Sequence, residues 1–229
     1  LDLSPECEEC GEDLHVNSVD KPHIDWVKVV CSECGHITNV SMIRLSGEMK
    51  ERGEIKDRIK SLAKSFIENT KNKDVQIISH FDTDGISSAA LAMLALKKLD
   101  KRFSLEIVKS LTDDFISQLD KEKPVLFLDL ASGSLETIKN SGLKEVYIVD
   151  HHELPSGEET EISGNIEIAN PQLHDKEKLS GSALTYLFSK AMDENNKEHA
   201  KLGILGLIGD SMEKEMDKIA NEILEDSEI

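Results

Sequence analysis

The chain has 229 residues, of which 38% are hydrophobic and 31% are charged, and its formal net charge at pH 7 is −18. This composition is typical of a globular chain that buries a core, and the length suits one α/β domain of middling size with an appendage. The acidity argues against a nucleic-acid-binding protein that works through a uniformly positive surface. No apolar run approaches the roughly 20 residues of a membrane span and no signal peptide opens the chain, so we expect a cytoplasmic protein with no membrane partner.

All the cysteines lie near the start of the chain, as CEEC (7–10) and CSEC (31–34). Two CxxC pairs at this separation can place four thiolates tetrahedrally around one zinc ion. The β-branched and aromatic segment 23–31 is expected to form a strand, so we predict a zinc ribbon over 1–42 with one closed, structural Zn²⁺ site. Disulfides, a redox-active CxxC and a substituting histidine are the alternatives. The predicted zinc ligands are Cys7, Cys10, Cys31 and Cys34.

Residues 43–73 contain apolar residues at helical spacing, namely Ile55, Ile59, Leu62, Phe66 and Ile67. This spacing predicts an amphipathic linking helix. Between Arg44 and Lys73 there are nine basic and five acidic residues, a local excess of positive charge. The basic residues either contact a nucleic-acid backbone or form the solvated face of a connector, and the second interpretation is the simpler one.

Beyond Asp74, short apolar segments alternate with helical stretches. We predict strands over 75–80, 104–110, 124–130, 145–150 and 165–170, and helices over 86–99, 113–119 and 134–140. Continuous runs of Val, Ile and Leu indicate strands covered on both faces, and hence a parallel sheet. The predicted fold class is α/β: a parallel-sheet domain over 74–212 with helices on both faces, preceded by the small zinc ribbon and the linking helix. Residues 213–229 are expected to begin a connecting helix.

Carboxylates and imidazoles follow the ends of these segments. They occur in HFDTDG (80–85), at Asp129, in the triplet DHH (150–152) and at Asp210. Because ligands bind beyond the carboxyl ends of parallel strands, we expect these side chains to share one rim. Repulsion and desolvation would raise their pKa values, and divalent cations remove that penalty. Oxygen ligands combined with imidazole suit Mn²⁺ or Mg²⁺ better than zinc.

The pair Asp82 and Asp84 is arranged as D-x-D and can present both carboxylates to one side of the chain. One carboxylate can then serve each of two metal ions, as in two-metal phosphoester hydrolases. Gly85 permits the turn, and the helix that follows directs its positive N-terminus at the site, where a phosphate can bind. The sequence therefore predicts a two-metal centre that acts on a phosphoester.

Taken in order, HFDTDG, LFLDLA, VDHH and LIGD resemble the DHH phosphoesterase superfamily. Its members include RecJ-type exonucleases, oligoribonucleases, cyclic-dinucleotide phosphodiesterases and family II pyrophosphatases. The resemblance covers residues 74–212. Within the superfamily, NPQ (170–172) followed by LSGSALTYLF (179–188) resembles the RecJ branch. The N-terminal zinc ribbon resembles that of archaeal RecJ-like nucleases, which work with the replication machinery.

The resemblance implies a metal ligand for each motif. Asp82 would bind the first metal ion and Asp84 the second, with Asp129 bridging the two. His151 and Asp210 would complete the second site. The implied cofactors are two Mn²⁺ or Mg²⁺ ions, which would serve a two-metal hydrolysis.

Other residues are expected to act beside the metals. The resemblance implies that His152 faces the scissile phosphate and that Asp150 orients a histidine. His80 is either a further ligand of the first metal or orients one. Ser87 lies at a predicted helix start and is expected to cap the helix or contact a phosphate. Ser182 is expected to lie at the start of another helix, with a phosphate contact as the alternative.

The expected function is that of a RecJ-like exonuclease that hydrolyses single-stranded DNA or RNA, with replication-complex proteins as further partners and a role in replication or repair. The alternatives are a phosphodiesterase on short oligonucleotides or cyclic dinucleotides, and a non-catalytic replisome scaffold. Most relatives carry a second domain that binds the end of the substrate, and nothing after Asp210 resembles it. The chain also begins at Leu1, so we expect a truncated protein with little nuclease activity by itself.

Overall fold

The computed structural model describes residues 26–30, 34, 37–41, 54–154, 164–174, 177–212 and 218–228. The chain forms two compact units, Leu1–Arg52 and Gly53–Ile229. In the first unit β1 (Trp26–Val30) pairs antiparallel with β2 (Ile37–Ser41), which confirms the strand predicted over 23–31. Cys34 is exposed between the two strands. The other predicted zinc ligands, Cys7, Cys10 and Cys31, lie outside the described residues, so the zinc site stays a prediction.

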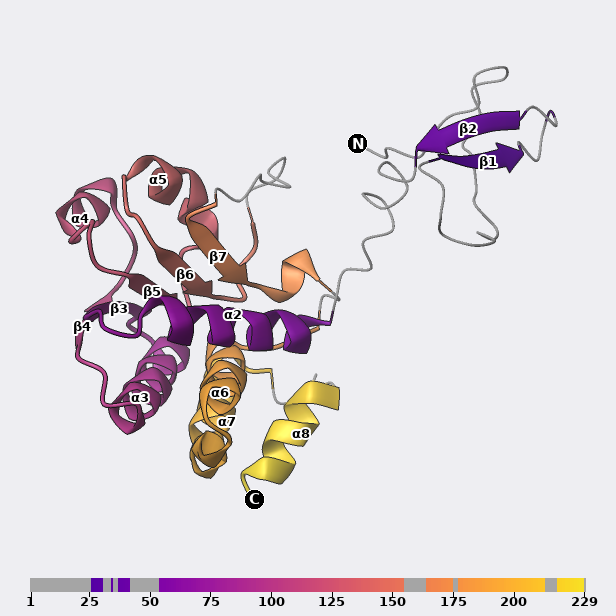
Figure 1. Cartoon of the computed structure of the whole chain (residues 1–229). Helices are drawn as coiled ribbons and strands as arrows, with labels where there is room; N and C mark the ends of the chain where they lie inside the picture. The colour runs from indigo at the N-terminus through magenta and orange to yellow at the C-terminus, as the bar shows by residue number, and fades with distance from the viewer. Residues whose placement is uncertain are drawn as a thin grey trace. The chain divides into compact units, whose positions relative to one another are not determined.

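The second unit is built on a sheet of five parallel strands: β3 (Val75–His80), β4 (Phe103–Val108), β5 (Val125–Leu128), β6 (Val146–Val149) and β7 (Ile166–Ala169). Their order across the sheet is β4-β3-β5-β6-β7 (Figure 1). The chain passes from β3 outwards to β4 and then returns to the other side of β3 for β5. The connections that leave the carboxyl ends of β3 and β5 therefore run in opposite directions. Ligand crevices in open parallel sheets form between two such strand ends.

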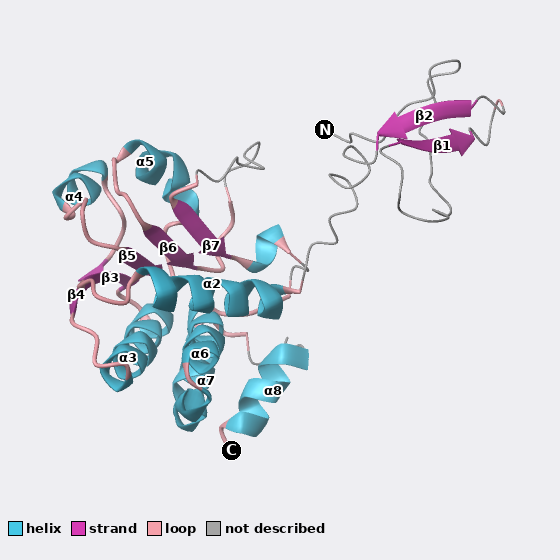
Figure 2. Ribbon diagram, in the orientation of Figure 1, coloured by secondary structure: helices cyan, strands magenta, loops and turns pink. Residues whose placement is uncertain are grey.

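Helices cover both faces of this sheet, which confirms the predicted α/β class (Figure 2). One face packs on α2 (Ile55–Asn69), α3 (Thr83–Lys98), α6 (Gly181–Met192), α7 (Ala200–Gly209) and α8 (Lys218–Asp226). The other packs on α4 (Asp113–Gln118) and α5 (Leu135–Asn140). Among the described helices, none combines the length and the hydrophobicity that crossing a membrane requires.

The predicted burial on both faces holds for some strands and fails for one. In β5, Leu126 faces one core and Phe127 faces the other, and both are fully buried. By contrast, β4 lies at the sheet edge, where Glu106 and Ile107 are exposed. The expectation that every strand is covered on both faces is therefore wrong for β4, whereas β7 at the other edge of the sheet is largely buried.

Helix α2 belongs to the core of the second unit. Its residue Phe66 is fully buried, and its ring lies 5.0 Å from that of Tyr147 and 5.5 Å from that of Phe188, both edge-on. The opposite face of α2 is solvated. Three of its basic residues form ion pairs inside the same unit: Lys56 with Glu222, Arg58 with Glu167 and Lys60 with Asp57.

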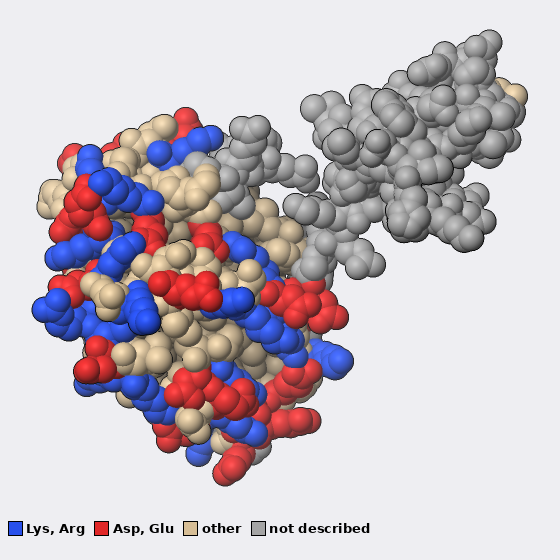
Figure 3. Space-filling model, in the orientation of Figure 1, with Lys and Arg blue, Asp and Glu red and all other residues tan. Residues whose placement is uncertain are grey.

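These ion pairs favour the solvated-face interpretation of the basic residues in α2. On the face shown in Figure 3, basic and acidic side chains are interspersed over the second unit. The net negative charge of the chain is therefore not gathered into one acidic patch on this face. Residues 43–53 of the predicted linking helix lie outside the described residues.

Candidate metal centre

Side chains from four separate segments meet at the carboxyl edge of the sheet. Their ligand atoms form three overlapping groups, in each of which all atoms lie within 4.8 Å of one another: His80, Asp82 and Asp129; Asp84, His151 and Asp210; and Asp129, His151 and His152. The segments are the end of β3 with the start of α3, the residue after β5, the loop after β6 and the end of α7. All six residues predicted as metal ligands are thus brought together, with His152 beside them.

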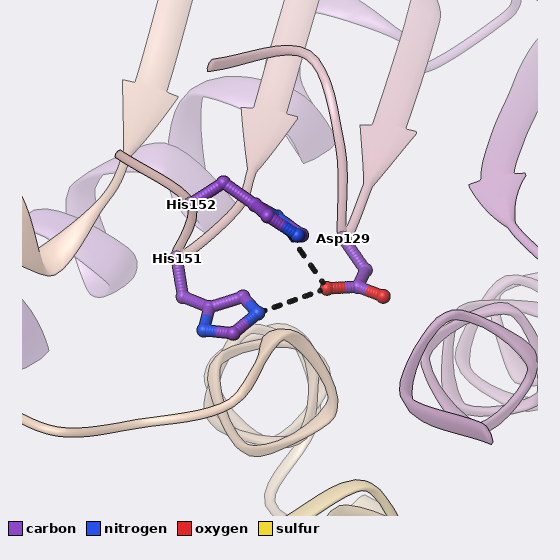
Figure 4. A group of neighbouring side chains, drawn as sticks. All are labelled: Asp129, His151 and His152. Atoms are coloured by element: carbon purple, nitrogen blue, oxygen red, sulfur yellow. Dashed lines mark ion pairs between the residues drawn. The ribbon is translucent and has the colours of Figure 1, made fainter. Parts of the chain in front are cut away.

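Asp129 belongs to two of the three groups, and His151 links one of these to the group of Asp84 and Asp210. Its Oδ1 lies 3.3 Å from Nε2 of His151 and 3.9 Å from Nδ1 of His152, and both rings point toward it from the loop after β6 (Figure 4). Its Oδ2 lies 3.7 Å from Nδ1 of His80. The side chain is 1% exposed, and within the described residues neither of its oxygens has a hydrogen-bond partner. Burial and repulsion from Asp84 raise the pKa of Asp129 to about 10.

Asp82 is the N-cap residue of α3. Its Oδ1 accepts a hydrogen bond from the backbone N–H of Gly85 at 2.9 Å, so it caps the helix, while its Oδ2 lies 2.7 Å from Nδ1 of His80. Gly85 is required here because a Cβ atom at this position would overlap the carbonyl group of His80. The glycine therefore lets the D-x-D turn fold back on the strand end.

Asp84 faces the N-terminus of α6. Its Oδ2 accepts a hydrogen bond from the backbone N–H of Gly181 at 2.6 Å, and its Oδ1 accepts one from that of Ser182 at 2.8 Å. The positive end of a helix stabilises an anion, so this contact holds a carboxylate that is 1% exposed. Two glycines leave room for the carboxylates at this helix end. A Cβ atom on Gly181 would lie 2.5 Å from Asp129, and one on Gly206 would overlap Asp84.

The two serines predicted as phosphate contacts are placed differently. Ser182 is fully buried, and its hydroxyl donates to the carbonyl of Gly203 at 2.9 Å while its backbone N–H holds Asp84. Ser87 is 5% exposed within α3. The N-cap of α3 is Asp82 and that of α6 is Ser180, so neither predicted serine caps its helix. Sequence reasoning identified the helix start at Ser182 but missed that its N–H groups point at a carboxylate.

His151 and Asp210 complete the second group. Nε2 of His151 lies 3.4 Å from Oδ2 of Asp210 and 3.7 Å from Oδ2 of Asp84. Asp210 follows the last residue of α7, where the helix dipole is negative and disfavours an anion. Burial and repulsion from Asp84 raise the pKa of Asp210. Of the carboxylates in the centre, Asp129 and Asp210 are thus the two that most need a cation.

Asp150 lies behind the centre and orients His152. Its Oδ1 is 2.7 Å from Nδ1 of His152, and its Oδ2 accepts a hydrogen bond from the backbone N–H of Ser132 at 2.8 Å. Burial alone would raise the pKa of Asp150, but these hydrogen bonds outweigh it and hold the pKa at about 2. The carboxylate is therefore ionised, so Nδ1 of His152 is the donor. The same hydrogen bond raises the pKa of His152.

Asn170 connects the loop after β5 to the loop after β6 through hydrogen bonds, and sequence reasoning missed it as a site residue. It is fully buried, and its Nδ2 donates to Oγ of Ser132 at 2.8 Å and to the carbonyl oxygen of His152 at 2.9 Å. The signal was the NPQ segment, whose asparagine is the last residue of the strand predicted over 165–170. A buried asparagine at that position must satisfy its amide on neighbouring loops.

The donor set fits divalent metal ions. The site is anionic: it contains the two buried oxygens of Asp129, which have no hydrogen-bond partner among the described residues, and three further carboxylates. Imidazoles lie beside them, and no cationic side chain of the described residues pairs with these carboxylates. A bound cation would neutralise this charge. Carboxylate and imidazole ligands suit Mn²⁺ or Mg²⁺. The residues of the centre could therefore hold such ions, with Asp129 between the two outer groups.

Comparisons with known proteins agree with this geometry. A model of the DHH family, N-terminal domain, matches residues 74–208. The chain is 31% identical over 144 residues to an uncharacterised protein of Methanocaldococcus jannaschii, an alignment that covers 59% of this chain and 32% of that protein.

Solved structures show the same fold. A manganese-bound exonuclease RecJ superposes with a TM-score of 0.60 at 19% identity, covering 73% of this chain and 46% of that one. RecJ from Thermus thermophilus in complex with Mn²⁺ superposes with a TM-score of 0.54 at 21% identity, covering 67% and 24%. The chain thus spans less than half the length of each of these relatives.

Proposed function

The chain belongs to the DHH family, and we propose that it is a metal-dependent phosphodiesterase that hydrolyses single-stranded DNA or RNA from one end, in DNA replication or repair. The observation that carries the proposal is the buried Asp129 carboxylate between two further groups of ligand atoms. The fold shared with manganese-bound exonuclease RecJ supports it. A non-catalytic scaffold has no need to keep Asp129 buried without a hydrogen-bond partner among the described residues, because its ionised form is unfavourable there without a cation.

In this proposal His80 and Asp82 would hold one metal ion, Asp84, His151 and Asp210 would hold the other, and Asp129, which is grouped with His80 and Asp82 and also with His151, would serve both. Mn²⁺ or Mg²⁺ would supply a Lewis acid for the phosphate and for a water molecule. The chain itself fixes the ligand positions before substrate arrives. Asp82 is held by the first turn of α3, and Asp84 by the first turn of α6.

His152 contributes a proton and a positive charge. Its Nδ1–H is donated to Asp150, which leaves Nε2 of a half-exposed ring to face the substrate. The raised pKa of His152 keeps both ring nitrogens protonated to a higher pH than in an isolated histidine. Nε2–H can then donate to a phosphate oxygen and stabilise the negative charge that develops during attack.

The test is hydrolysis of 5′- and 3′-labelled single strands of DNA and RNA, from dinucleotides to long strands, with Mn²⁺ or Mg²⁺. The expected result is stepwise release of nucleotides by the full-length protein with Mn²⁺ and a large loss of rate for Asp129→Asn. A full-length protein that binds Mn²⁺ and cleaves no strand of any length would contradict the proposal. Cleavage restricted to dinucleotides would instead favour a phosphodiesterase that acts on short substrates.

A further inference from the structure

A cleft of about 500 Å³ adjoins the candidate metal centre. His80, Asp129 and His152 are among the residues that line it, so the cleft is continuous with part of the centre. The loops after β4 and β5 supply further lining residues. Sites for small organic ligands commonly have volumes of about 300 to 1,000 Å³, a range that suits one nucleotide.

Lys109 supplies positive charge to this cleft. Val108, the last residue of β4, pairs with His80, so Lys109 leaves the sheet at the same edge as the metal centre. It is exposed, and it is the only Lys or Arg among the described residues that line the cleft. Within the described part of the chain it forms no ion pair, unlike Lys56 or Lys190, which are bound to carboxylates. Its charge is therefore available to an anionic ligand.

The loop after β5 supplies apolar residues to the lining of the cleft. Leu130 and Ala131 are apolar and line the cleft next to Asp129. Gly133 follows them, is exposed, and a Cβ atom placed on it would meet no atom within 4 Å. The cleft thus combines a metal-binding end, an ammonium group and an apolar wall with open space beside it. A phosphate ester joined to a flat aromatic heterocycle, whose face can lie against an apolar surface, matches this combination.

We propose that the cleft binds one nucleotide of the substrate strand next to the phosphate that is cleaved. Lys109 contacts the phosphate of this nucleotide, and its nucleoside lies along the wall formed by Leu130 and Ala131. The inference rests on the proposed function and adds to it a subsite for a second phosphate. It explains how an acidic chain holds a polyanion, since the charge of Lys109 is placed beside the metal centre rather than spread over the surface.

The first experiment measures the salt dependence of strand binding. Fluorescence anisotropy of a labelled thymidine oligonucleotide with phosphorothioate linkages, with Mn²⁺ present, compares the chain with Lys109→Gln and Lys97→Gln. Lys97 is an exposed lysine in the last turn of α3, at the opposite end of that helix from Asp84, so its variant carries the same charge change away from the cleft. Lys109→Gln is expected to weaken binding about fivefold and to lower the slope of log affinity against log salt by about 0.7.

The second experiment fills the cleft. Gly133→Leu adds a side chain into open space within the cleft, and Gly164→Leu does so at an exposed position outside it. Neither glycine has a positive φ, so neither substitution strains the backbone. Gly133→Leu is expected to weaken binding of the same oligonucleotide about tenfold or more, an effect near 1.4 kcal/mol, with Gly164→Leu unchanged.

The outcomes separate the two proposals. If the chain cleaves strands but Lys109→Gln and Lys97→Gln bind alike, the subsite is wrong and the proposed function stands. If no strand is cleaved, yet binding still depends on Lys109 and Gly133, the subsite stands and the hydrolytic function fails. If the chain with Mn²⁺ binds no oligonucleotide at low salt, the subsite is overturned.

Discussion

Gly206 lies against Asp84 so closely that a Cβ atom at position 206 would overlap the Oδ1 atom of the carboxylate, together with Oγ of Ser182. Gly206→Ala is therefore expected to push Asp84 away from the N–H groups of α6. Groups that orient metal ligands typically contribute 10- to 100-fold to metal affinity, so we expect about a tenfold or greater loss of Mn²⁺ affinity at one site, measured by isothermal titration calorimetry.

Gly203→Ala is the matched control for this change. Gly203 lies on the same helix, where a Cβ atom would be 3.0 Å from Cβ of Tyr186 and would touch no metal ligand. This variant is expected to lose stability through tight packing and to keep its Mn²⁺ affinity. Equal Mn²⁺ affinities for the two variants would show that Gly206 does not position Asp84.

Asp129→Asn tests whether the pKa of Asp129 is raised when no metal ion is bound. The pKa of Asp129 is raised to about 10 in the folded chain, while an unfolded chain has an aspartate pKa of about 3.9. Between these values the folded state holds a proton that the unfolded state has released. The free energy of unfolding should therefore fall as pH rises, by up to about 1.4 kcal/mol per pH unit from this group.

The measurement is urea unfolding in EDTA between pH 5 and pH 8, for the chain and for Asp129→Asn. The variant should lack the part of the slope that Asp129 supplies, because asparagine does not titrate. Mn²⁺ competes with the same proton, so its affinity for the unmodified chain should rise with pH. Parallel stability profiles for the two proteins would contradict the assignment.

Asp150→Asn tests the control of His152. The hydrogen bond from His152 to the Asp150 carboxylate is the main cause of the raised histidine pKa, so the variant should lower that pKa. Because a raised histidine pKa retains the proton as pH increases, hydrolysis by the variant should decline at a lower pH than hydrolysis by the unmodified chain. NMR titration of the His152 ring measures the pKa directly; an unshifted titration would refute the coupling.

Asn170→Ala tests the loop that carries His152. The change leaves the His152 carbonyl and the Ser132 hydroxyl without their donor, and unsatisfied buried groups cost about 1 to 3 kcal/mol, measured by urea unfolding. Asn165→Ala is the control, since Asn165 donates to the carbonyl of Leu143 before β7 begins. Both variants should lose stability, but hydrolysis should fall with Asn170→Ala alone. Equal hydrolysis would leave Asn170 with a purely structural role.

The predicted zinc site is tested by metal content. We expect about one zinc ion per chain by mass spectrometry, and its loss in Cys10→Ser. Mn²⁺ binding at the centre formed by Asp129 should persist in that variant. A chain purified under reducing conditions without zinc, or a Cys10→Ser variant with unchanged zinc content, would count against the ribbon.

Much of the second unit follows from sequence because local pattern and tertiary position agree there. The strand predicted over 75–80 matches β3 residue for residue, since its apolar run is buried and its end is marked by His80. The carboxylates and imidazoles were predicted to meet because the carboxyl ends of parallel strands share one edge. Their grouping around Asp129 in the structure agrees with that expectation.

Other features depend on contacts between segments that no local pattern reveals. That β4 lies at the edge follows from strand order, and the reach of Asn170 to His152 depends on how two loops fold together. The start of α6 was recognisable, but its approach to Asp84 is set by the packing of α3, α6 and α7. A serine at a helix start looks the same in sequence whether its N–H groups bind a phosphate or a carboxylate.

The backbone at Asp129 restricts which residues can occupy that position. Its φ of 57° lies in the left-handed region, where glycine is free and asparagine and aspartate are tolerated better than other side chains. Of these three, aspartate alone carries a negative charge. A longer acid such as glutamate, which could also bind a metal, would meet both a conformational penalty and a closed space beside Gly181. The backbone thus favours glycine, asparagine or aspartate at this position, and of these aspartate alone supplies an anionic ligand for a metal ion.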